Sequence, residues 1–203
     1  MRKFPIELLW LAILIVPLSC GGGGGGGGGS SQQVTVAIKP PSATVPLGNT
    51  QSFTATVTGS NAKVTWSVQE GSAGGAVSTA GSYQAPNTAG TYHVVASTDT
   101  SPPVTASAPV TVPIQVQVTP PTDTCTVGDV VDYAANVLGS ANQAVTWTIQ
   151  EGAAGGSISS AGVYKPPAVA GTYHIVATSA VDTTRPGVVP VTVQTSNGTV
   201  TIQ

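Results

Sequence analysis

The chain has 203 residues, of which 7% are charged, and six Lys and Arg stand against eight Asp and Glu. Binding to nucleic acid requires a basic surface that neutralises phosphates, so this composition excludes a nucleic-acid partner. The 25 glycines and 16 prolines leave no uninterrupted window for long helices, which excludes a helix bundle.

Residues 1–19 are predicted to be a signal peptide. Two basic residues follow Met1, and the apolar run from Leu8 to Leu18 is too short to span a bilayer as a helix. Ser19-Cys20 at its end resembles the cleavage site of bacterial lipoprotein precursors, although Pro17 stands where that family usually has Leu or Val. The resemblance implies that Cys20 becomes the lipidated first residue of the mature chain. An ordinary signal peptide cleaved near Ser19 is the alternative.

Residues 20–33 form a predicted tether. The glycine run Gly21–Gly29 is followed by Ser and Gln residues, so the segment has no apolar side chains to bury and behaves as a flexible coil. Gly21 also replaces the Asp that retains members of the lipoprotein family at the inner membrane. The resemblance therefore implies a lipid-anchored protein of the bacterial cell envelope, at the outer membrane or cell surface, or a secreted protein if Cys20 carries no lipid.

The rest of the chain consists of two copies of one repeat unit, which we place at residues 34–112 and 114–194. Matching residues keep nearly the same offset along the whole unit, which is typical of tandem duplication. The offset changes from 80 to 81 residues after Gly59 and Gly139, which predicts a turn there because turns absorb insertions. The matching pairs are Pro40 and Pro120, Gly48 and Gly128, Trp66 and Trp147, Glu70 and Glu151, Tyr83 and Tyr164, and Tyr92 and Tyr173.

Apolar residues alternate with polar ones in both units, and a period of two predicts β-strands. Turn residues rich in Gly, Pro and Asn separate these runs. About seven short strands in roughly 80 residues predict a two-sheet antiparallel sandwich. In the first unit the alternating sets are Val34-Val36-Ile38, Phe53-Ala55-Val57, Val64-Trp66-Val68, Tyr92-Val94-Ala96 and Val110-Val112.

Trp66 and Trp147 lie on the third predicted strand of each unit, and Gly-Thr-Tyr recurs with Tyr92 and Tyr173 as its last residue. On these residues the units resemble immunoglobulin-like sandwiches, and more narrowly the bacterial Ig-like domains of the Big group, which occur in tandem on secreted and surface proteins. The resemblance implies that the tryptophans belong to the core and that Tyr92 and Tyr173 form tyrosine corners. The expected fold class is all-β: two tandem Ig-like antiparallel sandwiches after a signal peptide and a poly-Gly linker.

No disulfide within a unit is available, because Cys20 and Cys125 are the only cysteines. Packing must therefore stabilise each unit, and truncation of Trp66 or Trp147 to Ala should cost about 3–5 kcal/mol. Pro113 alone separates the units and predicts an end-to-end rod. Residues 195–203 can add a hairpin strand through an Asn-Gly turn or remain a loose terminus.

The ionisable residues that repeat do not predict a catalytic site. His93 and His174 occupy equivalent positions in different units, as do Glu70 and Glu151, so a shared site would have to bridge the two domains. We expect the histidines to face solvent from a strand, and the glutamates to supply turn polarity or a backbone cap.

The second unit carries the candidates for metal or thiol chemistry. Asp123, Asp129 and Asp132 cluster around its first turn and could hold Ca²⁺, although their counterparts in the first unit are uncharged. Cys125 aligns with Val45, and its neighbours in sequence include no basic residue that would lower its pKa. We therefore expect a small buried apolar residue there.

Tyr83 and Tyr164 belong to a Gly-x-Tyr-x-x-Pro motif that is common in Big domains, and we expect them to be the most exposed aromatic residues. The chain offers no nucleophile with its base and no cofactor loop, so neither an enzyme, a cofactor nor a small-molecule substrate is predicted. The expected function is a non-catalytic cell-surface lipoprotein, a spacer or adhesion module that reaches the membrane through Cys20 and contacts an extracellular protein. Binding of a glycan or wall polymer through Tyr83 and Tyr164 is the alternative.

Overall fold

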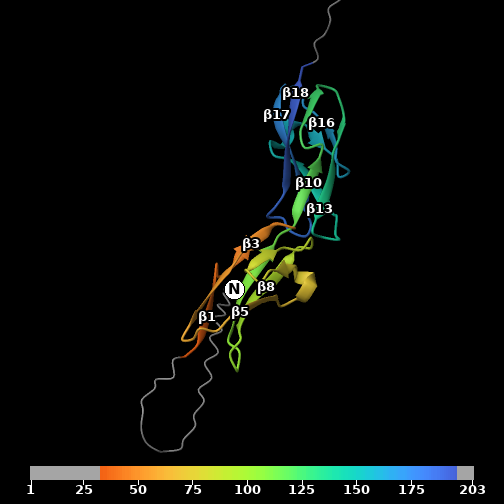
Figure 1. Cartoon of the computed structure of the whole chain (residues 1–203). Coiled ribbons are helices and arrows are strands. Elements are labelled where there is room, and N and C mark those ends of the chain that lie inside the picture. The colour runs from red at the N-terminus through yellow and green to blue at the C-terminus, as the bar shows by residue number, and fades with distance from the viewer. Residues whose placement is uncertain (1–32, 196–203) are drawn as a thin grey trace, which may run out of the picture. The chain divides into compact units, whose positions relative to one another are not determined.

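The computed structural model describes residues 33–195, where all regular elements are β-strands apart from two single-turn 3-10 helices (Figure 1). The predicted signal peptide, Cys20 and the glycine run lie outside the described residues, as does the predicted hairpin of the tail from Ser196 onward. Within the described range, no helix has the length and apolarity needed to cross a membrane.

Strands in the first repeat form where apolar and polar side chains alternate. In the third predicted strand, for example, Thr65 and Ser67 are exposed while Trp66 between them is partly buried. The elements of this repeat are β1 (Thr35–Lys39), β2 (Ala43–Thr44), β3 (Thr50–Ser52), β4 (Thr54–Thr58), β5 (Val64–Val68), η1 (Gly71–Gly74), β6 (Ala76–Val77), β7 (Ser82–Gln84), β8 (Gly90–Thr98) and β9 (Thr105–Val112).

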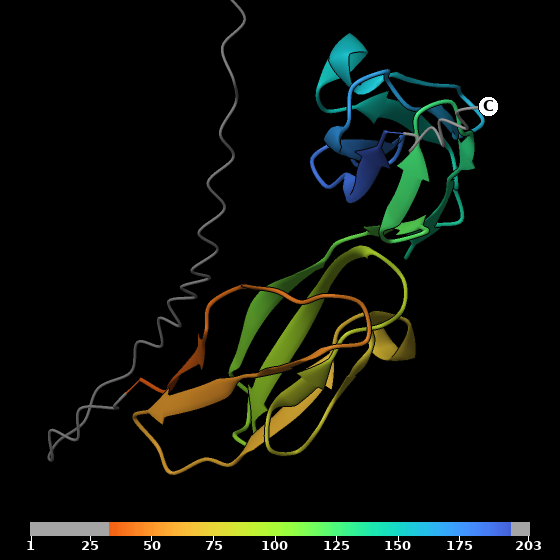
Figure 2. The same ribbon diagram turned by 90° about the horizontal axis from the view of Figure 1, so that it is seen from above.

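The second repeat has the same elements in the same order, and its 3-10 turn follows the strand with Trp147. Figure 2 shows the two turns in gold and cyan. The elements are β10 (Gln115–Thr119), β11 (Asp123–Thr126), β12 (Val131–Asp132), β13 (Ala134–Leu138), β14 (Val145–Ile149), η2 (Gly152–Gly155), β15 (Ser157–Ile158), β16 (Val163–Lys165), β17 (Gly171–Ser179) and β18 (Gly187–Gln194).

Each repeat is a sandwich of two layers. One layer is the four-stranded sheet β2-β9-β8-β5, repeated as β11-β18-β17-β14. The other is built from β1-β4 and β3-β7-β6, repeated as β10-β13 and β12-β16-β15. Phe53 lies between β3 and β4 and donates its backbone N–H to Gly81 O at 2.8 Å, so the two parts form one layer. All strand pairs are antiparallel except β2-β9 and β11-β18. This arrangement confirms the predicted all-β fold of Ig-like sandwiches.

The turn that differs in length between the repeats lies between β4 and β5 and between β13 and β14. The longer version contains Gln143, whose amide group fixes the loop. Its Oε1 accepts the Val137 N–H at 2.8 Å, and its Nε2 donates to Val137 O at 3.0 Å and to Ser140 O at 2.8 Å. The extra residue is therefore absorbed outside the strands.

Each sandwich has its own apolar core. Trp66 and Trp147 pack against these cores but are only partly buried, because β5 and β14 are edge strands of their sheets. Tyr83 and Tyr164 are instead the largest fully buried side chains. The largest fully buried apolar side chains are Val45, Phe53, Tyr83, Val94, Val110 and Val112 in the first sandwich, and Val137, Tyr164, Ile175, Val191 and Val193 in the second.

Candidate functional site

A carboxylate and an imidazole meet at the same place in each sandwich, and we call this contact the Glu–His pair. In the first sandwich Nδ1 of His93 lies 2.7 Å from Oε1 of Glu70, and the backbone N–H of His93 donates to Oε2 at 3.0 Å. In the second, Glu151 and His174 repeat both distances. One carboxylate therefore binds the ring and the backbone of the same histidine.

The local chain path places the glutamate there. Gln69 follows β5 and donates its N–H to His93 O at 2.9 Å, which keeps the chain in register with β8 up to Glu70. The helix η1 then turns away, and its buried Gly74 has no room for a side chain. A Cβ at Gly74 would lie 2.7 Å from Cγ1 of Val68 and 3.1 Å from the Tyr92 ring.

The two carboxyl groups of the Glu–His pairs are acidic. Burial raises the pKa of Glu70, but the hydrogen bonds from the ring and the backbone of His93 outweigh this effect, so the net shift is downward. For Glu151 the hydrogen bond from the His174 ring is the largest cause of its lowered pKa. The carboxylate favours the tautomer that carries a proton on Nδ1. Each pair thus links the end of an edge strand to the long central strand beside it.

The Glu–His pair has the orientation of a second-shell group behind a metal-binding imidazole, but further ligands are missing. Across residues 33–195 no three His, Cys, Asp or Glu side chains come close enough to hold a metal ion. The geometry therefore supports a structural role, in which the carboxylate of the Glu–His pair holds the loop that contains η1 or η2.

Tyr83 and Tyr164 are buried, so the prediction that they are exposed is wrong. They have 0% exposure, because β7 and β16 are the central strands of the three-stranded sheets and direct these side chains into the core. Their hydroxyl groups donate to Gly74 O at 2.7 Å and to Gly155 O at 2.8 Å. Burial raises the pKa of both phenols to about 12. Neither ring is available to a glycan.

The tyrosines in the Gly-Thr-Tyr motifs hold the segment that precedes the long central strand. The hydroxyl of Tyr92 donates to Thr88 O, and that of Tyr173 donates to Val169 O, each at 3.0 Å. A side-chain bond to a carbonyl four residues upstream is the geometry of a tyrosine corner.

Each tryptophan covers a glycine that no other residue could replace without strain. Gly81 and Gly162 have φ values of +82° and +86°. A Cβ at either position would lie 2.3 or 2.2 Å from a backbone carbonyl oxygen, and 3.1 or 3.2 Å from the ring of Trp66 or Trp147. The indoles can pack across the two sheets because these positions carry no side chain.

The three aspartates of the calcium hypothesis do not form a site. Asp123 Oδ1 accepts the N–H of Thr124, and Asp129 Oδ2 accepts the N–H of Thr126, both at 2.7 Å. Asp132 lies on β12. Calcium takes about six to eight oxygen ligands, and no three acidic side chains come together within residues 33–195. Asp123 and Asp129 instead cap their own loop backbone, so the geometry gives the calcium hypothesis no support.

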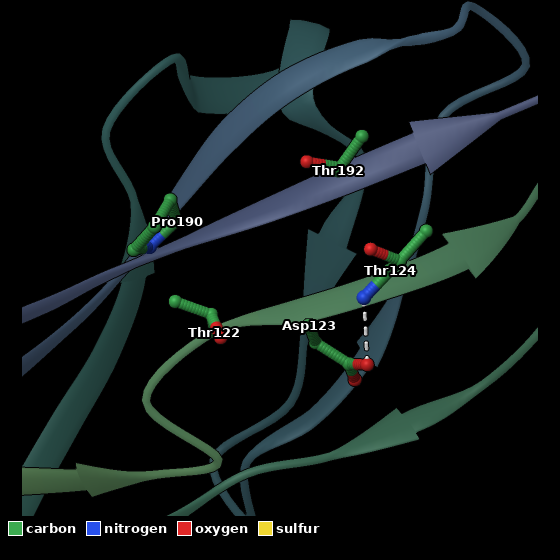
Figure 3. Close-up of a pocket in the computed structure, with 5 residues that line it drawn as sticks. All are labelled: Thr122, Asp123, Thr124, Pro190 and Thr192. Atoms are coloured by element: carbon green, nitrogen blue, oxygen red, sulfur yellow. Dashed lines mark hydrogen bonds between the residues drawn. The ribbon is translucent and has the colours of Figure 1, made fainter.

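A surface hollow of about 380 Å³ lies along the parallel pair β11-β18 (Figure 3). Asp123 is the single titratable group of its lining, and its carboxylate is bonded to the neighbouring backbone N–H (Figure 3). The lining consists of Thr122, Asp123, Thr124, Pro190 and Thr192. With no aromatic, cationic or nucleophilic side chain besides hydroxyl groups, the hollow has no distinctive binding chemistry.

Cys125 is buried in β11 opposite Val193 of β18. Burial, and after it the charges of Asp123 and Asp129, raises the pKa of its thiol. The thiol is therefore in its unreactive protonated form at neutral pH.

The Glu–His pair is the feature that the sequence prediction missed. Matching positions across the repeats pair histidine with histidine and glutamate with glutamate, and this match does not indicate a contact between the two residue types. Glutamate and histidine are separated by 23 residues in both repeats, but the duplication gives every pair of matching positions in this region the same spacing, so the spacing alone does not identify the contact.

Comparisons with known proteins give no family. No family model matches the chain, and no curated protein matches it either. Two similar solved structures are mouse Cadherin-23 EC22-24, with 14% identity over 81% of this chain and 65% of that chain at a TM-score of 0.35, and Drosophila N-cadherin EC1-4, with 11% identity over 80% of this chain and 50% of that chain at a TM-score of 0.34. The chain thus spans between one half and two thirds of their length.

Proposed function

We propose that this protein is a non-catalytic module of the bacterial cell surface, where two Ig-like sandwiches act as a spacer or contact another protein. The observation that carries the proposal is that both sandwiches use their repeated polar residues to hold loops. The Glu–His pair and the buried tyrosine hydroxyl both act on the segment around η1 or η2.

The same residues argue against an enzyme. A general acid–base pair needs a cavity in which a substrate can reach it, and a nucleophile or bound water to act on. Glu70 and Glu151 are instead occupied by two hydrogen bonds each from one histidine.

Protein contact is favoured over glycan binding. Glycan sites use exposed aromatic rings, and the two tyrosines expected to supply them are fully buried. The end loops and the sheet edges remain as contact surfaces, and they suit another polypeptide.

Lipid attachment at Cys20 is part of the proposal and rests on the sequence of the first thirty residues. The test is mass spectrometry of the mature chain after expression of the full precursor in a bacterium that carries out lipoprotein processing. An acylated Cys20 and loss of membrane association in Cys20→Ser are expected. A mature chain that begins near Cys20 without lipid would make the protein secreted, and retention in the cytoplasm would contradict surface location altogether.

The non-catalytic role is tested by a broad hydrolase screen of the full mature chain. We expect no activity that depends on Glu70 or Glu151. Turnover that Glu70→Gln or Glu151→Gln abolishes, with the fold intact, would contradict the proposal.

A further inference from the structure

The strand that carries Trp147 is an open edge. The four-stranded sheets end in β5 and β14, each five residues long, whereas the neighbouring edge strands β6 and β15 of the other layer have two residues. An edge strand offers a row of N–H and C=O groups to another strand unless charges, proline or shortness prevent it.

The ladder to β17 shows which groups of β14 face outward. Gln150 N donates to His174 O at 3.0 Å, and Ala180 N donates to Ala144 O at 2.9 Å. In an antiparallel ladder, the backbone N–H and C=O groups of successive residues point alternately toward and away from the partner strand. The backbone groups of the even-numbered residues 144–150 therefore bond to β17. The N–H and C=O groups of Val145, Trp147 and Ile149 therefore face outward. No group in residues 33–195 is hydrogen-bonded to them.

The sequence of β14 is complementary to itself. Val145-Thr146-Trp147-Thr148-Ile149 reads nearly the same in both directions around Trp147. In an antiparallel pair centred on Trp147, Val145 faces Ile149 and Thr146 faces Thr148. The three outward-facing residues of each strand then meet their counterparts and exchange about six backbone hydrogen bonds.

Charge does not oppose this pairing. Residues 140–150 contain no charged side chain, and Glu151 would face the uncharged Gln143 of the other molecule. Gln143 is also held in its own loop by Val137 and Ser140. The partly buried Trp147 lies at the centre of the edge, where an added strand would cover more of its ring.

We propose that β14 pairs antiparallel with β14 of a second copy of this chain, so that two four-stranded sheets join into one of eight strands. This inference rests on the proposed function and names the protein partner that was left open there. A five-residue strand forms a small interface, so the association is weak in solution and grows with concentration. Attachment of many copies to one surface would raise their effective concentration.

The equivalent edge β5 is the matched comparison. Lys63 directly precedes it, in the loop where the second sandwich has Gln143 and Ala144. In a β5 pair centred on Trp66, Lys63 would face Gln69 of the other molecule, so it opposes pairing by placing a hydrated charge at the sheet edge and not by repulsion between like charges. We therefore assign the self-association to β14 and not to β5.

The test introduces charges on the outer face of β14, where Thr146 and Thr148 are exposed. In the proposed pair, position 146 of one molecule faces position 148 of the other. T146K/T148K places like charges opposite each other and should weaken self-association by at least about tenfold. T146K/T148E places unlike charges opposite each other and should restore it. T65K/S67K makes the same change at the exposed positions of β5 and should have no effect.

Self-association is measured by sedimentation equilibrium of the full mature chain, from about 10 µM to about 1 mM. Unchanged melting temperatures and near-ultraviolet circular dichroism show that the variants are folded. A wild-type chain that stays monomeric at the highest concentration overturns the inference. Equal weakening by T65K/S67K and T146K/T148K, or failure of T146K/T148E to restore association, overturns it as well. If the chain is monomeric but still reaches the cell surface and binds another protein, this inference fails and the proposed function stands. If the chain self-associates but is absent from the surface, only the proposed function is contradicted.

Discussion

The two sandwiches share their strands, their Glu–His pair and their buried tyrosine, but they differ in the polarity of their cores. Phe53 in the first core is replaced by Tyr133 in the second, and the hydroxyl of Tyr133 is buried without a hydrogen-bond partner among residues 33–195. Val45 is likewise replaced by Cys125. The shared features fix the fold, whereas the exchange of Phe53 for Tyr133 places an unpaired hydroxyl in the second core and should lower its stability.

The largest effect is expected from the buried tyrosine that both sandwiches share. Tyr83→Ala or Tyr164→Ala removes a fully buried ring and a hydrogen bond, and should cost about 3–5 kcal/mol. Each substitution should unfold its own sandwich and leave the other unchanged. Trp66 and Trp147 lie in different sandwiches, so urea unfolding followed by fluorescence in variants that keep only one of them, Trp147→Phe or Trp66→Phe, reports on each sandwich separately. Tyr→Phe at positions 83 and 164 is the control. Equal loss in both sandwiches would contradict independent cores.

A smaller effect is expected from exchanging the core residues Phe53 and Tyr133, which differ between the two sandwiches. Phe53→Tyr should destabilise the first sandwich by about 2 kcal/mol, because the new hydroxyl would be buried without a partner. Tyr133→Phe should stabilise the second by about 1 kcal/mol. Both changes are measured by urea unfolding. A loss of stability in Tyr133→Phe would show that the hydroxyl is satisfied, for example by an ordered water molecule.

The Glu–His pairs predict that the stability of both sandwiches depends on pH. The pKa values of Glu70 and Glu151 are lowered from 4.5 in the folded chain, so the carboxylates contribute stability above that pH. The contribution is lost as the pH falls from 4.5 through the folded-state pKa. These side chains are partly exposed, so we expect about 1 kcal/mol in each sandwich.

The control for this dependence is substitution of one glutamate at a time. In Glu70→Gln, the first sandwich should lose less stability as the pH falls below 4.5. The second sandwich should lose as much stability as it does in the wild type. An unchanged pH profile of both sandwiches in Glu70→Gln would argue that other carboxyl groups are responsible.

The smallest effect is expected at Cys125. Cys125→Val introduces the residue of the first sandwich and should change the free energy of unfolding by less than about 0.5 kcal/mol. In the wild type, the buried thiol should react with a thiol-specific reagent only after urea has unfolded the second sandwich. Rapid reaction of the folded chain would mean that β11 detaches easily from β18.

The longer strands could be predicted from the sequence because five or more residues show an alternating pattern. β5 and β14 are examples, with three apolar residues separated by polar ones. The three-residue strands β7 and β16 could not be found in this way, because each directs only its tyrosine inward and so shows no period. For the same reason the sequence analysis expects Tyr83 and Tyr164 to be exposed, although both are buried.

The Glu–His pair was beyond reach for a different reason. Glu70 and His93 meet only because Gln69 extends the β5-β8 ladder by one bond beyond the strand. Alternation places residues on faces, but it does not fix the register between two strands that are far apart in sequence. The partial exposure of Trp66 and Trp147 depends in the same way on strand order, which makes β5 and β14 edges.

The parallel pairs β2-β9 and β11-β18 have a consequence for mechanical load. In each sandwich an early strand lies parallel to the last one, so a pull on the two chain ends draws the paired strands in opposite directions along their length. Their hydrogen bonds are then loaded in shear and must break together. β11 pairs with β18 over four residues, whereas β2 pairs with β9 over two. The second sandwich should therefore extend at the higher force in a single-molecule stretching experiment, and the first should act as the earlier-yielding element of a protein under tension.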